Sequence, residues 1–248
     1  MLRFAAAFGR FTMKQLTAAV QSLPSEQPRL LTPQEAVAGS TPDPLAGAWG
    51  IAWCYGDRVE SIRSNRPHNS DPEFSKLAEL RSDMALICLH PPVSRLKPRE
   101  VQPFIRKEPA ATWAFFHFGH ISHPELLDTG NRLPDGPSAS ERYFLHILNR
   151  LDLNKPVESV QAALQPLRDE TALAFVLMSP QIAIISSGTA AINPPARRIH
   201  LGRGELLRLV APERLTTFEN VRWEVMPAGQ TIVVLRERRA IAEAGPKH

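Results

Sequence analysis

The sequence predicts an α+β protein in which helices flank packed β-sheets. Many short apolar runs of strand length are separated by a few paired helical segments, an order typical of layered α+β folds. The chain has 248 residues, of which 43% are hydrophobic and 22% are charged, as in ordinary globular proteins. The sequence contains neither a domain linker nor an internal repeat, so we expect residues 1–248 to form one domain.

Outside residues 24–46, the first half of the chain is expected to form five strands and two helices. Met13, Leu16 and Val20 recur at helical spacing and predict a helix over residues 12–23. Asp71-Pro72 predicts the start of a second helix, because proline is favoured at the first helical position. The expected strands cover residues 2–8, 49–53, 58–63, 84–89 and 112–118, with a hairpin turn at Gly56-Asp57.

Two successive helices are expected in the second half. Ser138 and Glu141 have the spacing of a capping box, in which each side chain accepts a backbone N–H of the first helical turn. The helix that follows carries Phe144 and Leu148, and a second one carries Val160 and Leu164. The remaining expected strands cover residues 173–178, 181–187, 205–210, 222–225 and 230–236, with a tight turn at 227–229.

Proline is unusually frequent, with 23 prolines against 13 glycines. Five of them lie in residues 24–46, which we interpret as a long excursion with one short helix near 33–37. This excursion is the first candidate for a partner-binding surface. A short flexible tail is expected at about 239–248.

Composition narrows the function classes. Two cysteines form neither a disulfide framework nor a CxxC zinc pair, which favours a reducing cytoplasm. No run approaches the length of a membrane span, and residues 2–8 are interpreted as a buried strand rather than a signal peptide. The net charge is only +4, and the basic residues are scattered along the chain rather than clustered. We therefore expect no nucleic-acid partner.

Short motifs follow one another along the chain in a recognisable order. They are an N-terminal strand, Trp49–Trp53, Ser70–Pro72, Met84–Leu89, Gln102–Phe104, Trp113–Ile121, Ser140-Glu141, Val210–Thr216 and Trp223–Gly229. This order resembles the class II glutamine amidotransferases, which have the N-terminal-nucleophile hydrolase fold. The resemblance covers most of the chain outside residues 24–46. It implies a four-layer α-β-β-α sandwich of two antiparallel sheets.

The nucleophile position of that family holds a different residue type here. The family begins Met-Cys-Arg, and removal of Met leaves Cys as the nucleophile with its own amine as the base. This chain has Leu2, which offers no nucleophile and normally blocks Met removal. Arg3 matches the family, where it is a supporting residue.

The resemblance implies that the substrate and oxyanion positions have changed as well. His90 replaces the arginine that grips the α-carboxylate of glutamine, and a neutral imidazole cannot form that bidentate pair. Phe118, between His117 and Gly119, replaces the asparagine that donates to the oxyanion. Ala139 replaces the aspartate that pairs with the substrate ammonium. Glu100, Gln102 and Ser140 complete the degenerate pocket.

These changes lead to one main hypothesis and two alternatives. The main hypothesis is a catalytically inactive protein that acts as a regulatory or structural module, with a protein partner and without cofactor or metal; a homo-oligomer is left open. One alternative is an enzyme with relocated chemistry that uses His90, His117 and Glu100. The other is a small-molecule sensor that uses the altered pocket.

Several residues admit a second interpretation. His117, His120 and His123 are three residues apart, which suggests zinc, but ordinary histidines are favoured. The two cysteines are expected to be buried, inert thiols. Aromatic residues around the degenerate pocket either fill it or line an apolar groove; they are Phe115, Phe116 and Phe118.

Overall fold

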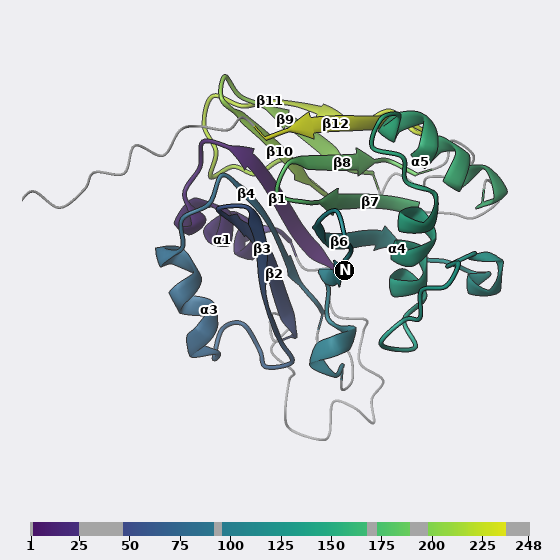
Figure 1. Cartoon of the computed structure of the whole chain (residues 1–248). Helices are drawn as coiled ribbons and strands as arrows, with labels where there is room; N and C mark the ends of the chain where they lie inside the picture. The colour runs from purple at the N-terminus through teal and green to yellow at the C-terminus, as the bar shows by residue number, and fades with distance from the viewer. Residues whose placement is uncertain (1, 25–46, 92–95, 168–172, 189–197, 237–248) are drawn as a thin grey trace, which may run out of the picture.

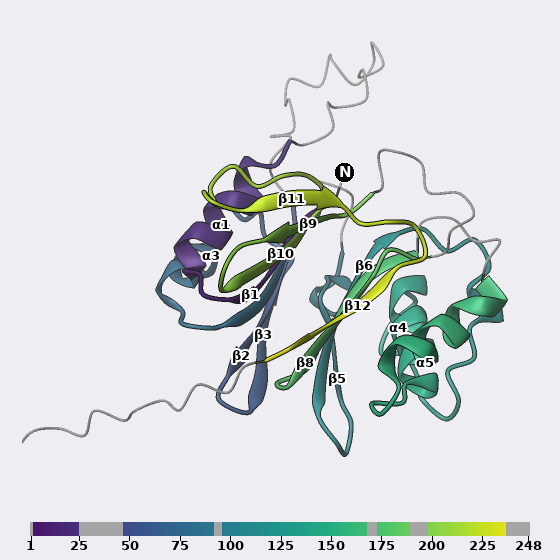
Figure 2. The same ribbon diagram turned by 90° about the horizontal axis from the view of Figure 1, so that it is seen from above.

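The computed structural model describes residues 2–24, 47–91, 96–167, 173–188 and 198–236. Its centre is a pair of antiparallel β-sheets packed face to face, with helices on the two outer faces (Figures 1 and 2). The expected excursion at 24–46 lies outside the described residues except for residue 24, and so does the short helix expected near 33–37. The tail expected at about 239–248 also lies outside them. The α+β sandwich that the sequence predicts is confirmed.

Seven strands form the first sheet, in the order β11-β9-β10-β1-β4-β2-β3. Their bounds are β1 Arg3–Gly9, β2 Trp49–Tyr55, β3 Arg58–Ser64, β4 Met84–Leu89, β9 His200–Arg203, β10 Leu207–Ala211 and β11 Arg222–Val225. All six residues of β4 are buried, because this strand lies inside the sheet and both faces of the sheet are covered. The expected hairpin between β2 and β3 is confirmed, and Gly56 adopts the positive φ that its turn needs.

Five strands form the second sheet, in the order β12-β8-β7-β6-β5. Their bounds are β5 Phe104–Lys107, β6 Thr112–Gly119, β7 Leu173–Met178, β8 Ile182–Ser186 and β12 Thr231–Leu235. The expected tight turn at 227–229 is present, and Gln230 N–H donates to the Pro227 carbonyl at 3.2 Å. This turn carries the chain from β11 in the first sheet to β12 in the second.

Helices cover the outer face of each sheet (Figure 2). The first sheet is covered by α1 (Met13–Ser22) and α3 (Pro72–Lys76), and the second by α4 (Ala139–Arg150) and α5 (Pro156–Leu164). Within the described residues, no helix is long and apolar enough to cross a membrane.

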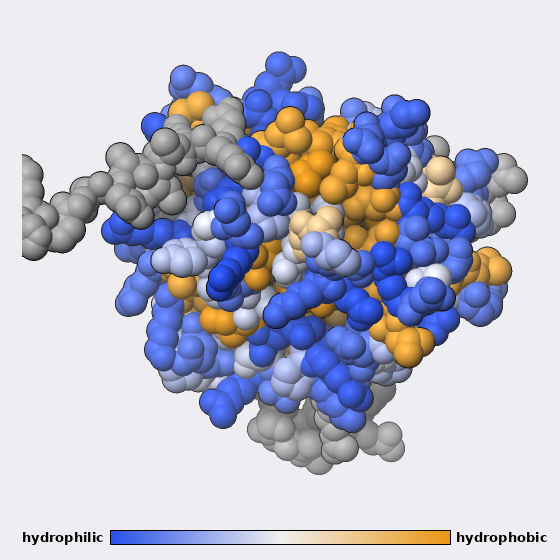
Figure 3. All heavy atoms as spheres, viewed as in Figure 1, coloured by the Kyte–Doolittle hydropathy of each residue, from blue (hydrophilic) through white to orange (hydrophobic). Residues whose placement is uncertain are grey.

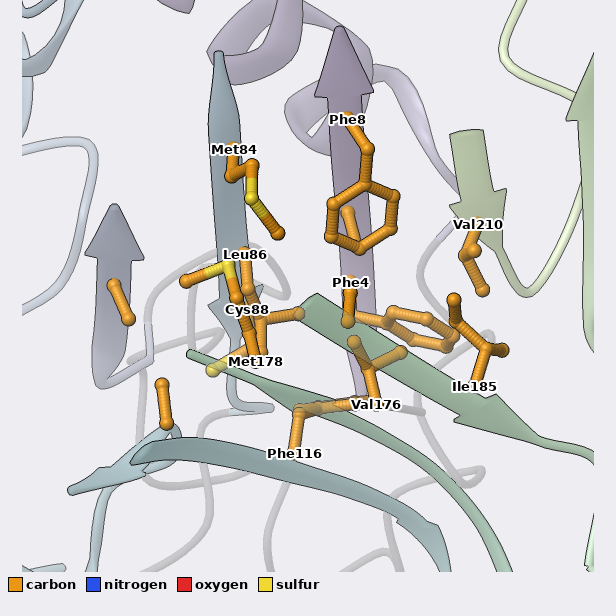
Figure 4. Close-up of a cluster of buried hydrophobic side chains, with 14 of the residues drawn as sticks. Phe4, Phe8, Met84, Leu86, Cys88, Phe116, Val176, Met178, Ile185 and Val210 are labelled. Carbon is orange, nitrogen blue, oxygen red and sulfur yellow. The ribbon is translucent and has the colours of Figure 1, made fainter. Parts of the chain in front are cut away.

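The core follows the two-residue period of the strands. In β1, Phe4 and Phe8 point into the space between the sheets, while Ala5 and Ala7 face α1 (Figure 4). The small alanines let the helix approach the sheet closely. Two further hydrophobic cores lie between each sheet and the helices that cover it, so the four layers follow the order helices, sheet, sheet, helices.

Asp71 ties α3 to the first sheet. Its carboxylate caps α3 by accepting from Glu73 N–H, and it also accepts from Ser64 Oγ at 2.6 Å and Trp49 Nε1 at 3.1 Å. Burial alone would raise the pKa of Asp71, but these hydrogen bonds outweigh it and hold the pKa below its usual value. The predicted helix start at Asp71-Pro72 is therefore confirmed.

Two sequence expectations differ from the structure. Strands β5 and β9 were not expected; each has only four residues and carries charge, so neither shows a long apolar pattern. The capping box at Ser138 is wrong. The side chain of Ser138 makes no capping bond, and Glu141 instead accepts from the backbone N–H groups of Asp135 and Gly136, both at 2.9 Å.

Candidate functional site

Two of the predicted site residues, Leu2 and His90, lie where β1 begins and β4 ends. The pairing of β1 with β4 matches Arg3 to Leu89, so the same register places Leu2 beside His90. On the other side, His90 N–H donates to the Ala48 carbonyl at 2.7 Å. Leu2 is half-buried and packs against the core between the sheets, so the structure brings Leu2 and His90 together.

His90 is buried and turned toward the backbone of Gln102. Its Nε2 accepts the Gln102 N–H at 3.1 Å, which fixes the neutral ring with its proton on Nδ1. Burial lowers the pKa of His90 to about 4, from an ordinary value of 6.5. The ring is therefore uncharged at neutral pH and supplies no cation for a carboxylate.

Gln102 joins the two sheets at this site. Its Oε1 accepts from His117 N–H at 2.6 Å and its Nε2 donates to the His117 carbonyl at 3.2 Å, so the side chain continues the pairing of β5 with β6 ahead of the first residue of β5. Its own carbonyl accepts from Cys88 Sγ at 2.6 Å. Gly50 allows this approach, because a Cβ at that position would collide with the Gln102 carbonyl.

The His117 side chain lies on the face of the second sheet that the helices cover, and not on the face between the sheets. Its neighbours Phe116 and Phe118 point between the sheets, so His117 points toward α4. There its Nδ1 lies 2.9 Å from Ser140 Oγ, and its ring packs edge-on against Tyr143 with centroids 5.2 Å apart. The structure therefore pairs His117 with Ser140, while the His90 ring faces the space between the sheets.

Phe118 fills part of the space between the two sheets. It is buried, and its ring centroid lies 5.3 Å from that of Phe4, which also contacts Phe116 at 4.3 Å. Phe115 points to the opposite face and stacks on Phe144 at 5.0 Å. The expectation that Phe115 shares the pocket with Phe116 and Phe118 is therefore wrong, because successive strand residues alternate between faces.

Arg3 is buried on the helix side of β1. Its guanidinium donates to the carbonyls of Gln21 and Leu23, at 3.2 and 3.4 Å, where α1 ends. A cation at the C-terminus of a helix satisfies free carbonyls and the helix dipole. The Arg3 side chain thus stabilises the packing of α1 on the sheet.

The remaining predicted site residues, Glu100, Gly119 and Ala139, lie on three different elements. Glu100 lies in a single 3-10 turn and accepts from Lys97 N–H at 2.9 Å. Gly119 ends β6 opposite Leu173, and Ala139 is the first residue of α4.

Both cysteines are buried, as the sequence predicts. Burial raises the pKa of Cys54 to about 12 and raises the pKa of Cys88 as well, so both remain protonated thiols. Among the described residues, no group of three or more His, Cys, Asp or Glu side chains is arranged to hold a metal ion. His123 instead contacts Glu125 at 3.0 Å on the surface.

Sequence reasoning missed a cavity at the far end of β1. It has a volume of about 330 Å³ and is lined by residues of β1, β4, β10 and β12, including Phe8, Met84, Arg208 and Val234. No single sequence motif marks it, because its walls come from four separated strands.

Comparison with known proteins gives the family. Residues 28–191 match the class-II glutamine amidotransferases, and because this is more than half of the chain, the chain belongs to that family. A curated relative, the putative glutamine amidotransferase YafJ of Escherichia coli (strain K12), is 24% identical over 123 residues. The match covers 48% of each protein, so the chain spans about half the length of this relative.

Solved structures confirm the fold of the N-terminal-nucleophile hydrolases. Glutamine phosphoribosylpyrophosphate amidotransferase from B. subtilis, complexed with ADP and GMP, aligns with a TM-score of 0.67 at 14% identity. That alignment covers 94% of this chain and 47% of the other. A glutamine aminotransferase class-II domain protein from Silicibacter pomeroyi aligns with a TM-score of 0.61 at 16% identity, covering 93% and 94%. At these identities the likeness concerns the fold alone.

Proposed function

We propose that this chain is a catalytically inactive class II glutamine amidotransferase-like domain that acts as a regulatory or structural protein-binding module. The observation that carries the proposal is Leu2, which stands at the family's nucleophile position where β1 begins. An aliphatic side chain can neither attack an amide carbon nor hold a proton for transfer. Loss of a nucleophile costs about a millionfold in rate in a well-studied hydrolase.

The oxyanion position supports the same proposal. Phe118 aligns with the family's asparagine, and its ring packs against Phe4 in the core between the sheets. A phenyl ring donates no hydrogen bond to a developing negative charge. Removal of one oxyanion donor costs on the order of a hundredfold to a thousandfold in rate.

The substrate-binding positions also lack the required charges. His90 aligns with the arginine that holds the glutamine carboxylate, and its neutral ring already accepts the Gln102 N–H. Ala139 aligns with the aspartate that pairs with the ammonium group. A zwitterionic amino acid would lose both counter-charges there, at about 2 kcal/mol or more for each unpaired charge.

A protein-binding role follows from a retained fold without retained chemistry. We propose that residues 1–248 act as one domain with a protein partner, without a cofactor or nucleic acid. Two free, buried cysteines fit a reducing compartment, so we propose the cytoplasm as its location. The alternatives based on a shared His90 and His117 pocket receive less support, because the His117 ring hydrogen-bonds with Ser140 on the other face of its sheet.

Glutamine hydrolysis tests the proposal directly. The purified chain is incubated with glutamine, and ammonia is measured against a heat-killed sample and against an active class II amidotransferase. We expect ammonia release equal to that of the heat-killed sample and no rise in melting temperature with millimolar glutamine. Release above the heat-killed sample would contradict the proposed inactivity, and stabilisation by glutamine alone would contradict the loss of the substrate site.

A further inference from the structure

Strand β12 differs from the other strands at the edges of the two sheets. Edge strands expose unpaired backbone groups, and proteins commonly protect them with charged side chains. Three edges follow this rule. Their charged residues are Arg222 and Glu224 in β11, Arg58, Glu60 and Arg63 in β3, and Arg106 and Lys107 in β5. The fourth edge, β12, has the sequence Thr-Ile-Val-Val-Leu and carries no charge.

The register of β12 against β8 identifies which backbone groups point outward. Arg236 N–H donates to the Gln181 carbonyl at 2.9 Å, so this residue pair is hydrogen-bonded. Hydrogen-bonded pairs alternate in an antiparallel ladder, so the even-numbered residues of β12 bond to β8. The N–H and C=O groups of Thr231, Val233 and Leu235 therefore point to the free edge, and within the described residues they have no strand partner there.

The side chains of this edge are also apolar and partly exposed. Leu235 is 72% exposed, and the three preceding residues of β12 are half-buried. In Figure 3 an apolar patch lies at the top of the molecule, where Figure 1 draws β12. Figure 2, which looks down on this side, shows β12 in front of the second sheet. An exposed apolar strand of this kind marks a surface that another strand can cover.

We propose that β12 pairs antiparallel with β12 of a second copy of this chain, with the two-fold axis passing beside Val233. In this register Val233 faces its own copy and Thr231 faces Leu235, so all the outward groups become paired. Each of the three pairs forms two backbone hydrogen bonds. Ile232 then lies opposite the second copy's Val234, and pairs of β-branched side chains stabilise adjacent strands. The proposal goes beyond the proposed function and does not depend on catalytic inactivity.

Charge favours a second copy as the occupant. Two copies of β5, for example, would bring only positive charges together along the shared edge, and like charges that lie opposite each other are destabilising. The uncharged β12 avoids this, and the same register places Arg236 opposite the neutral Gln230. Arg236 itself is held by Asp83 at 2.8 Å within its own chain. The dimer would join the second sheets of both copies into one continuous sheet.

Sedimentation velocity over a concentration series tests the proposal with the full chain. We expect a monomer–dimer equilibrium. Val233→Pro removes an outward N–H without touching the ladder to β8, and two central hydrogen bonds are lost per dimer. The dimer dissociation constant should rise by about thirtyfold, since each net hydrogen bond contributes about a five-fold effect.

Val225→Pro provides a matched control on an edge of the first sheet. Met226 N–H donates to the Ile199 carbonyl, so the N–H of Val225 also points outward, from β11. We expect this variant to dimerise like the wild type. A wild-type protein that is monomeric at all concentrations, or equal effects of both variants, would overturn the proposal.

Hydrogen exchange supplies a second readout that needs no variant. The outward amides of Thr231, Val233 and Leu235 should exchange more slowly at high protein concentration than at low concentration. The amides of β11 should not respond to concentration. Slow exchange of the β12 amides in a monomer would show that another segment of the same chain covers this edge, and it would overturn the dimer.

Discussion

The burial of His90 predicts a specific loss of stability in mild acid. The folded-state pKa of about 4 lies below the ordinary value of 6.5, so the unfolded chain binds the proton more readily between these pH values. Stability is therefore complete above pH 6.5 and falls as the pH falls toward 4. One pKa unit corresponds to about 1.4 kcal/mol, so the full loss is about 3 kcal/mol, of which about 2 kcal/mol is lost between pH 7 and 5.

Urea unfolding at pH 7 and pH 5, followed by tryptophan fluorescence, measures this loss. The matched variant is His90→Gln, whose amide oxygen can still accept the Gln102 N–H but does not titrate. Burial also lowers the pKa of His146, and that contribution is the same in both proteins. We expect the free energy of unfolding to fall by about 2 kcal/mol more in the wild type than in the variant. Equal losses in both proteins would refute a buried, neutral His90.

Substitutions at three further positions test the packing around Gln102 and α3, each by denaturant unfolding at pH 7. Gly50→Ala should destabilise the fold by about 3 kcal/mol, because its Cβ would collide with the Gln102 carbonyl inside a sheet; a change below 1 kcal/mol would contradict this close approach. Gln102→Glu should cost about 2–3 kcal/mol, because a carboxylate would replace the amide that donates to the His117 carbonyl; a stability equal to the wild type would exclude this bridge. Asp71→Ala should cost about 3 kcal/mol, because it removes a helix cap and leaves the buried Trp49 N–H unpaired, whereas Asp71→Asn should retain part of that stability.

Sequence patterns predicted correctly the helices and strands whose start or burial depends on neighbouring residues in the chain. The six apolar residues of Met84–Leu89 predicted a doubly covered strand, and the structure buries all of them. The helix start at Asp71-Pro72 was also confirmed, since its cap and its proline act within one turn. The short strand Phe104–Lys107 was missed because its residues alternate too briefly and include two charges.

The structure brings some of the predicted site residues together and separates others, and their role as a site stays a prediction. The order of motifs implied that Leu2 and His90 share one place, and the pairing of β1 with β4 brings them together. The same order gave no direction for His117, which the alternation of β6 turns toward Ser140. The bridge through Gln102 had no sequence signal, because it depends on the approach of two separate sheets.

The sequence by itself determined the fold class, the family resemblance and the residue types at the catalytic positions, because these depend on local periodicity and on the order of motifs. Only the tertiary structure decided that His90 is neutral, because burial and the Gln102 N–H come from residues distant in the chain. It also decided which amides of β12 point outward, because a strand's free edge exists only once the sheet is assembled.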